Sequence, residues 1–416
     1  MHRPSLKINF LWAFAGNSFY ALCGYLLLTI LAKTSPVETV GLWGIGQAVT
    51  LPVATFFSLK LCTVNITDVR NTYQTGHYIA VRLLASLASV VISAVIGFVF
   101  YPLQTALVIS FMGISQAVAE IRAYFLSNFQ KYERLNLATG SQVAEGILAL
   151  LLFLLLFWPT RNLLLAIGGI ILARLSVLCF YDMPVSARVL SAHQPEGFGG
   201  YRPRWHWPKI WSLFNYAAPL AVVGAVMNIS QHIPRLVMDK SLGRDAVGYF
   251  TALSMLLVVY TMIHSALGNA ALPRLSRYFT ESIRLFVRLF VQLIILMLAV
   301  GLVFVAGVYF FGKPLLTFLF TAEYARYNDV LMMLAVASSV LAVFSVSNWG
   351  LNATRQFVVQ MPIYIGTAIV SGVCSLLLIP RFGIMGGAYT FFCSYMFGAL
   401  ICIVFVMKAV RKNHVG

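Results

Sequence analysis

The sequence predicts an all-α, polytopic membrane protein with about twelve transmembrane helices in two halves of six. Of its 416 residues, 60% are hydrophobic and 10% are charged, whereas soluble domains carry about 25% charged residues. Apolar runs of helix length recur along the whole chain, and a bilayer accepts such helices because each satisfies its own backbone hydrogen bonds. Matching features recur in the two halves, which predicts an internal repeat.

Twelve windows of helix length give the predicted spans. The first is the apolar stretch from Ile8 to Ala32, which is longer than the core of a signal peptide, so we expect it to be retained as a helix. Short turns at Pro102 and Pro159 separate two of the helix pairs. The predicted spans are 8–32, 40–60, 79–101, 104–128, 138–158, 161–183, 212–235, 246–270, 286–311, 329–352, 358–379 and 384–407.

The basic residues predict the orientation of the chain. Its net charge of +17 is spread through short connectors and is not gathered on one face, so we expect no nucleic-acid partner. If both termini lie inside, the internal segments hold 18 Lys and Arg residues and the external connectors hold 7. This excess follows the positive-inside rule. We therefore expect the N- and C-termini to be cytoplasmic.

The longest connector, residues 184–211, divides the chain into halves. It is polar, rich in Gly, Pro, Trp and Arg, and lies between the sixth and seventh spans. We expect an N-terminal six-helix lobe at 1–183, this cytoplasmic linker, and a C-terminal six-helix lobe at 212–416. Tryptophans at the end of the linker are typical of anchors at the headgroup level, with a ligand site as the alternative. They are Trp205, Trp207 and Trp211.

The two halves also match in sequence at one constant offset. In both, a Lys with a hydroxyl neighbour precedes a helix start that contains Val-Gly and an aromatic residue, and a basic loop follows. Corresponding helices then run in the same direction, which predicts parallel repeats related by a pseudo-twofold axis along the membrane normal. Chance similarity of apolar sequence is the alternative. The matched residues are Lys33-Thr34, Val40 to Trp43 and Arg70 in the first half, and Lys240-Ser241, Val247 to Phe250 and Arg277 in the second.

Motifs for catalysis and for nucleotide binding are absent from the sequence. The chain has no Walker loop, no GxSxG elbow and no HExxH helix. Its six cysteines lie in or beside apolar runs and form no paired metal-binding spacing. We therefore expect no catalytic residue, no metal, no cofactor and no energy supply from ATP bound to this chain.

Ionisable side chains inside the predicted spans are the candidate functional residues. Each costs about 2.5 to 3.5 kcal/mol at a helix centre unless a cavity or a partner accommodates it. Glu120 and Arg122 are two residues apart, so they point to nearly opposite sides of one helix and cannot pair with each other. Glu145 lies near the cytoplasmic start of its span, where we expect partial hydration, so Glu120 is the better candidate for ion coupling. The other candidates are Lys60, Arg174, His232, Arg235 and His264.

The seventh span is interrupted by two prolines, Pro219 and Pro234. Proline lacks an amide donor and permits bending, so this helix suits a moving gate. A static kink, satisfied by neighbouring Asn and Gln side chains, is the alternative.

Several short stretches carry a family resemblance. They are Pro234 to Gly243 with Ala246 to Tyr249, Leu272 to Ser276, Gly312 to Tyr324, and Arg381 to Ala388. Together they resemble the lipid-linked oligosaccharide flippases of the multidrug, oligosaccharidyl-lipid and polysaccharide exporter superfamily, with the O-antigen and polysaccharide exporters as the nearest members. Pro234 stands where the family typically has an acidic residue, so no ion role is carried over to that position.

The resemblance implies two six-helix lobes and alternating access. It implies a flippase that moves an undecaprenyl-diphosphate-linked oligosaccharide, such as an O-antigen or a related surface polysaccharide repeat unit, from the cytoplasmic to the periplasmic leaflet of a bacterial cell inner membrane. A glycan polymerase and chain-length complex are the protein partners that such a role suggests.

The family's central cavity uses cationic residues to meet the diphosphate, and guanidinium groups match phosphate oxygens in bidentate geometry. The acids within the spans are too few to neutralise every intramembrane arginine here, which leaves a ligand as their natural complement. Amides would contact the sugar. The expected substrate-binding residues are Arg122, Arg174, Arg235, Lys60, Asn348 and Asn352, and the expected ion-coupling residues are Glu120 and Glu145.

Two other functions compete with this interpretation. An ion-coupled multidrug exporter, an antiporter of the same superfamily, would share the architecture, but its cavity should be acidic. A membrane glycan polymerase or ligase would act on the same lipid-linked substrates, but such enzymes usually carry a sizeable extracytoplasmic segment. The longest external connector here, about 311–328, is small.

Overall fold

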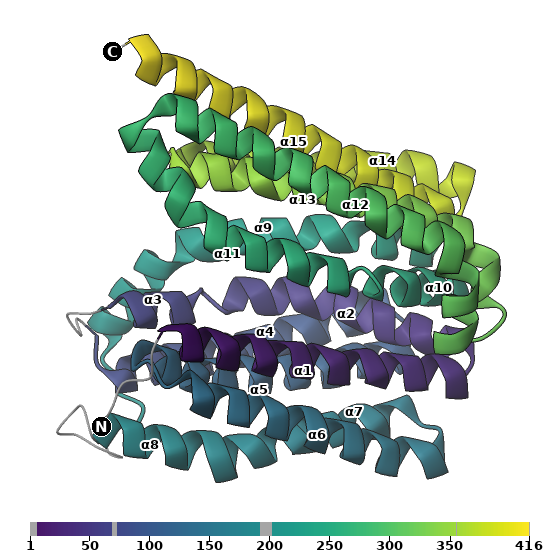
Figure 1. The fold of residues 1–416 in the computed structure, drawn as a ribbon. Helices are drawn as coiled ribbons and strands as arrows, with labels where there is room; N and C mark the ends of the chain where they lie inside the picture. The colour runs from purple at the N-terminus through teal and green to yellow at the C-terminus, as the bar shows by residue number, and fades with distance from the viewer. Residues whose placement is uncertain (1–5, 69–72, 192–201, 355, 416) are drawn as a thin grey trace. The chain divides into compact units, whose positions relative to one another are not determined.

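The computed structural model describes residues 6–68, 73–191, 202–354 and 356–415, and the ribbon in Figure 1 shows a protein built from helices. No strand occurs in these residues. The helices are α1 (Leu6–Thr34), α2 (Val37–Phe57), α3 (Leu61–Thr67), α4 (Thr75–Phe100), α5 (Leu103–Lys131), α6 (Leu135–Thr160), α7 (Leu163–Val177), a π-helical turn (Leu178–Asp182), α8 (Met183–Ser191), α9 (Trp207–Leu242), α10 (Arg244–Met255), α11 (Val258–Glu281), α12 (Ile283–Leu319), a 3₁₀ turn (Tyr324–Tyr327), α13 (Asn328–Ala353), α14 (Phe357–Phe382) and α15 (Ile384–Val415).

Most of these helices suit a bilayer. Within the described residues, ten spans are long and apolar enough to cross a membrane, or up to eleven if the bent pair within α9 is counted as one span. The predicted all-α, polytopic class is confirmed. The count of twelve stays a prediction, because α10 and α11 divide the predicted eighth span at Leu256 and Leu257.

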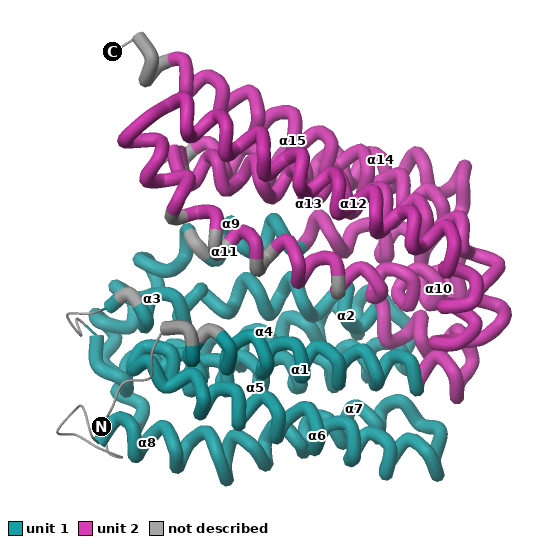
Figure 2. Tube along the Cα trace, viewed as in Figure 1, with its two compact units in different colours: residues 1–30, 45–228 teal, residues 31–44, 229–416 magenta. Residues whose placement is uncertain are grey.

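The chain forms two compact units, coloured teal and magenta in Figure 2. Unit 1 comprises residues 1–30 and 45–228, and unit 2 comprises residues 31–44 and 229–416. The predicted division into lobes at the linker 184–211 stays a prediction, and residues 192–201 of that linker lie outside the described residues. Arg70, which the sequence matched with Arg277, also lies outside them.

Unit 1 packs its helices in alternating directions. The start of α1 lies beside the turn between α5 and α6, since the Asn9 amide donates to the Glu133 carbonyl at 3.2 Å and Thr139 donates to the Trp12 carbonyl at 2.6 Å. Both places were predicted to face the cytoplasm. Their proximity agrees with the predicted alternation of helix directions.

Unit 2 brings several predicted external connectors together. Arg244, at the start of α10, donates to Glu38, near the start of α2, at 2.8 Å. Tyr249 donates to Glu323 at 3.3 Å, and its ring lies against that of Tyr324. Three of the predicted external connectors therefore lie close together in this unit.

The α9 helix bends at Pro219, the first of the two prolines of the predicted seventh span. The α9 segments Trp207–Pro219 and Ala221–Leu242 meet at an angle of 45°. A proline removes one backbone hydrogen bond and clashes with the preceding turn, which accounts for the bend. Whether this helix moves as a gate stays a prediction.

Candidate functional site

Arg122 on α5 lies at the centre of a buried ion-pair network in unit 1. Its Nε donates to Oδ2 of Asp182 at 2.7 Å, and its Nη2 donates to the Ser141 hydroxyl at 2.7 Å. The Ser141 hydroxyl donates in turn to Oδ1 of Asp182 at 2.5 Å. The third partner is Glu145 on α6, whose carboxylate pairs with Nη1 of Arg122. The Arg122 guanidinium is thus fully enclosed by acceptors.

Arg174 on α7 extends the same network. Its Nε donates to Glu145 Oε1 at 2.9 Å, and its Nη1 donates to both the carbonyl and the hydroxyl of Ser115, each at 2.7 Å. Tyr20 on α1 closes this side, because its hydroxyl donates to Glu145 at 3.0 Å and accepts from Arg174 at 3.3 Å. Glu145 is therefore held between two guanidinium groups.

Asp182 reaches this network because the helix changes its winding. Residues Leu178–Asp182 form a π-helical turn between α7 and α8. Such a turn has i→i+5 hydrogen bonds and takes more residues per turn than an α-helix, so the side chains that follow it point in a different direction. Asp182 is fully buried there, at 0% exposure. An ideal α-helix from Leu163 onward would place this carboxylate at another angle.

The network is balanced in charge. Two arginines face two carboxylates, and all four side chains are largely buried. Removing charges from water is costly, and a buried pair is tolerable only when the remaining lone pairs and protons are also satisfied. Ser115, Ser141 and Tyr20 supply those bonds. The network therefore ties α1, α5, α6 and α7 with its π turn together.

A second ion pair in unit 1 involves Glu120. Arg82 on α4 donates to Glu120 Oε2 at 2.9 Å and contacts the Cys62 sulfur at 3.6 Å. The Arg82 side chain is 2% exposed, whereas that of Glu120 is 29% exposed. Glu120 is accordingly an accessible carboxylate with one buried cationic partner. Arg82 lies near the start of the predicted span 79–101 and inside α4 (Thr75–Phe100).

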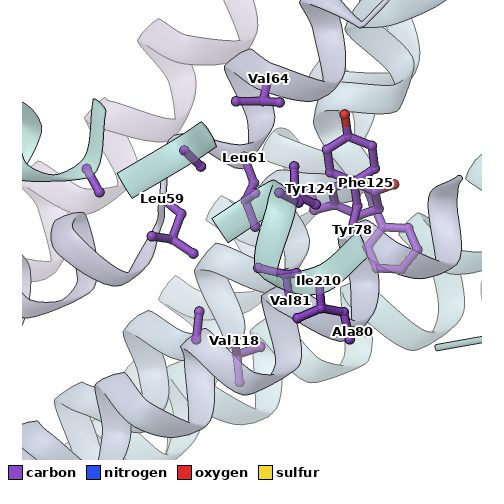
Figure 3. Close-up of a cluster of buried hydrophobic side chains, with 14 of the residues drawn as sticks. Leu59, Leu61, Val64, Tyr78, Ala80, Val81, Val118, Tyr124, Phe125 and Ile210 are labelled. Carbon is purple, nitrogen blue, oxygen red and sulfur yellow. The ribbon is translucent and has the colours of Figure 1, made fainter. Parts of the chain in front are cut away.

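Lys60 occupies a break between α2 and α3. Both Leu59 and Lys60 have left-handed backbone conformations, with φ of 49° and 47°. Non-glycine residues adopt this region at a cost of order 1–3 kcal/mol each, and tertiary packing must hold them there. The packing here comes from Leu59 and Leu61, which are buried in the apolar cluster of Figure 3.

This turn leaves the Lys60 side chain exposed next to α9. A Cβ added at Gly224 would lie 2.9 Å from Lys60 Cε, so the glycine provides the space in which the lysine lies. Lys60 forms no ion pair with any described residue. It is a strained, unneutralised cation in the middle of a long apolar stretch.

Arg235 on α9 is the candidate cation of unit 2. Its Nη2 donates to the Ser254 hydroxyl at 2.8 Å, and its Nη1 lies 3.1 Å from His232 Nδ1. Its Nε is buried and has no hydrogen-bond partner among the described residues. No acid pairs with it there, in contrast to Arg122 and Arg174. Among the described residues, its charge is therefore not neutralised by a carboxylate.

Two asparagines on α13 were predicted to contact sugar. Asn348 accepts from the Tyr364 hydroxyl at 2.9 Å, and Asn352 accepts from the Gln360 amide at 2.6 Å. Both bonds link α13 to α14. The carboxamides are therefore held in fixed orientations by their neighbours.

The structure separates the predicted site residues into groups. Arg122, Arg174 and Glu145 come together, while Glu120 pairs elsewhere in the same unit. The predicted partial hydration of Glu145 is wrong, since its side chain is 7% exposed and lies between two arginines. Sequence reasoning missed Asp182 and Arg82 as partners. A search for acids near the ends of spans would have flagged Asp182, but not its pairing.

Comparisons with known proteins agree with this architecture. The model of a family described as polysaccharide biosynthesis protein matches residues 6–279. The capsular polysaccharide biosynthesis protein CapF of Staphylococcus aureus is 25% identical over 410 residues, which cover 97% of this chain and 99% of that protein.

Two solved structures share the fold over nearly the whole chain. The inward-facing conformation of a multidrug resistance MATE family transporter of the MOP superfamily has a TM-score of 0.75 at 12% identity, covering 97% of this chain and 99% of the other. The lipid II flippase MurJ in an inward closed conformation has a TM-score of 0.73 at 12% identity, covering 98% and 90%. At these identities the likeness shows the fold alone.

Proposed function

Because this chain belongs to the polysaccharide biosynthesis protein family, we propose that it is a flippase for a lipid-linked oligosaccharide. The substrate is an undecaprenyl-diphosphate-linked repeat unit of a surface polysaccharide, such as an O-antigen or a capsule. The protein moves it by alternating access from the cytoplasmic leaflet to the opposite leaflet of a bacterial inner membrane, with both of its own termini cytoplasmic.

The relatives support this class of substrate. The name of the Staphylococcus aureus relative places that protein in capsular polysaccharide biosynthesis, and one protein with this fold is a lipid II flippase. The predicted membership of the exporter superfamily is confirmed by family and fold. The similar solved structures named above are transporters or flippases, which supports transport rather than catalysis.

The observation that carries the proposal is the unneutralised charge of Arg235. A half-buried guanidinium without an acid is costly in a bilayer protein unless a ligand complements it. A diphosphate is such a ligand, because its oxygens accept the paired N–H groups of arginine. Lys60 supplies a second unneutralised cation in unit 1. We assign the diphosphate to Arg235 first and keep Lys60 as a separate candidate contact.

Arg122 and Arg174 take a different place in the proposal. Their charges are already balanced by Asp182 and Glu145, so a substrate phosphate would have to displace a buried carboxylate. They contribute to substrate binding only in a state in which this network opens. While the network is intact, the two arginines hold together the helices that surround the network.

We propose that an ion gradient drives the cycle. Glu120 is the preferred coupling group, since its carboxylate is partly exposed and has one cationic partner, Arg82. Glu145 is the second candidate, but it is clamped by two arginines. For the glycan, Asn348 and Asn352 offer amide groups whose orientation is fixed by α14.

An ion-coupled multidrug exporter is the alternative, and the same fold occurs in such a transporter. A cationic drug would need unpaired carboxylates. In the described residues of the membrane helices, Glu145 and Asp182 are neutralised by arginines, so the charge pattern favours an anionic substrate. A glycan polymerase and a chain-length complex are the partners that we propose for the flippase.

The decisive experiment follows the lipid-linked glycan itself. In a strain that lacks this protein and any redundant flippase, the glycan should accumulate on the cytoplasmic leaflet, and wild-type protein should restore its normal distribution. A normal distribution without the protein would contradict the proposal. Proteoliposomes that export a cationic drug but leave the glycan in place would instead establish the exporter.

A further inference from the structure

The segment 202–212, which leads into α9, is fastened to the first turn of α4. The Arg204 amide donates to the Gly76 carbonyl at 3.0 Å, and the Arg204 guanidinium bonds the Gln74 side chain. A Cβ at Gly76 would lie 2.5 Å from the Arg202 carbonyl oxygen, so only glycine permits this close contact. The segment is a fixed element of unit 1.

The first turns of α9 have one buried face. Ile210 and Leu213 are 5% and 0% exposed and belong to the apolar cluster, where Ile210 is visible among the side chains of α3, α4 and α5 (Figure 3). Two further contacts fix the position: Tyr73 and Ser212 share a hydrogen bond of 3.0 Å, and the rings of His77 and His206 lie edge to face.

Three tryptophan side chains of this segment are exposed. The exposed fractions of Trp205, Trp207 and Trp211 are 53%, 65% and 63%. Tryptophan has a large apolar side chain whose burial would be favourable, so this exposure is unusual. Tryptophan at an exposed position of a membrane protein prefers the headgroup region, where the ring is partly apolar and its N–H can donate. Their backbone is held in place by the contacts with α4, so the rings form a preorganised surface.

The same surface is positively charged. Arg202 and Lys209 are exposed and form no ion pair with a described residue, and the segment 202–212 contains no acid. The nearby Asp68 is engaged, since its carboxylate accepts from the Tyr73 amide and the Tyr78 hydroxyl. Two free cations among three exposed indoles match a lipid headgroup with net negative charge.

We propose that the segment 202–212 is a binding site for an anionic phospholipid headgroup of the adjacent leaflet. Arg202 and Lys209 contact the lipid phosphate, and the tryptophans lie beside the glycerol and the upper acyl chains. The site does not depend on the proposed flippase substrate. It ties the chain between α8 and α9 to the bilayer and makes this protein selective for phosphatidylglycerol over phosphatidylcholine.

Native mass spectrometry of the full-length protein tests the proposal. Wild-type protein is released from mixed micelles that contain equal amounts of phosphatidylglycerol and phosphatidylcholine, and the retained lipids are counted. Wild type should retain an excess of phosphatidylglycerol. In R202Q/K209Q this excess should fall by about fivefold for each charge removed, because a basic residue near an anionic leaflet contributes about that factor at low salt.

The matched control is R161Q. Arg161 lies at the far end of α6, where it stacks on the exposed Trp158 at 5.1 Å, outside the segment 202–212. Its replacement should leave the phosphatidylglycerol excess unchanged. Retention of the full excess by R202Q/K209Q, or an equal loss in R161Q, would overturn the proposal.

Tryptophan fluorescence locates the lipid independently. In a variant whose other four tryptophans (Trp12, Trp43, Trp158 and Trp349) are changed to Phe, brominated phosphatidylglycerol should quench emission more strongly than brominated phosphatidylcholine at equal mole fraction. R202Q/K209Q in that background should bring the two curves together. Equal quenching by both lipids before the charges are removed would contradict a selective site.

Discussion

Gly41 on α2 and Gly248 on α10 pack against each other's helix at equivalent positions. A Cβ at Gly41 would overlap the carbonyl oxygen of Arg244, and a Cβ at Gly248 would overlap that of Val37. When the two predicted repeats are aligned, Val37 matches Arg244 as Gly41 matches Gly248. The repeat alignment therefore maps the contact of Gly41 with Arg244 onto the contact of Gly248 with Val37. A twofold axis between parallel repeats would produce this relationship.

Replacing either glycine should loosen this contact. We expect G41A and G248A each to destabilise the protein by about 1–3 kcal/mol, because the added methyl group meets backbone that cannot move aside. Thermal unfolding in detergent measures the effect. The control is G307A on α12, where a Cβ meets no atom within 4 Å, and which should be neutral or slightly stabilising. Equal melting temperatures for all three variants would show that the contact tolerates a side chain.

Arg235 should be needed for transport per molecule. R235K keeps the charge but loses the planar fork, so flipping in proteoliposomes should fall partly, whereas R235A and R235E should nearly abolish it. K240A, an exposed change on the same helix, is the control. If Arg235 only reaches toward headgroups, lysine would serve almost as well and the losses would follow protein abundance.

The pair Arg122 and Asp182 should behave as one unit in stability. D182N leaves the network with one excess positive charge, and R122M leaves one excess negative charge, so each should cost about 3–5 kcal/mol. In the double variant the remaining pair, Arg174 and Glu145, is again neutral in net charge. The double substitution should therefore destabilise the protein by less than the sum of the two single substitutions. Chemical denaturation of all four proteins gives the coupling energy.

The exposed pair Arg277 and Glu281 provides the comparison for that cycle. It is also an ion pair between a guanidinium and a carboxylate, formed by residues one turn apart on α11 whose side chains are 72% and 50% exposed. Solvent screening should leave its coupling far below that of the buried pair and close to the error of the measurement. Additive costs at Arg122 and Asp182, of the size seen at this exposed pair, would disprove the buried network.

Glu120 should link transport to an ion gradient. E120Q removes the titratable group while keeping the hydrogen bond from Arg82, so flipping should become independent of the gradient and slower than wild type. E281Q, which alters an exposed acid, should respond to the gradient like wild type. Uphill flipping by wild-type protein without any gradient or other energy source would refute ion coupling.

The orientation can be tested by cysteine labelling in a background without the six native cysteines. Single cysteines beside Arg204 and Arg411 should react only with reagent on the cytoplasmic side, and those beside Arg244 and Ala322 only with reagent outside. The reason is the excess of basic residues in the predicted internal segments. The reverse pattern would place both termini outside.

The sequence by itself determined the class of the protein and the places of most helices. The predicted span 104–128 corresponds to α5 at Leu103–Lys131, and the span 384–407 to α15 at Ile384–Val415. Apolar length alone carries this information, because a bilayer accepts helices of about 20 apolar residues and little else. The family also followed from short stretches of sequence.

Tertiary structure alone decided which charges remain free. Arg122 and Arg235 look alike in sequence, since each is a single arginine in an apolar helix, yet Arg122 meets two acids from other elements and Arg235 meets none in the described residues. The partner Asp182 lies 60 positions along the chain and is aimed by a π turn. Helical periodicity gives the face of one helix, but ion pairing depends on how several helices pack and where their winding changes.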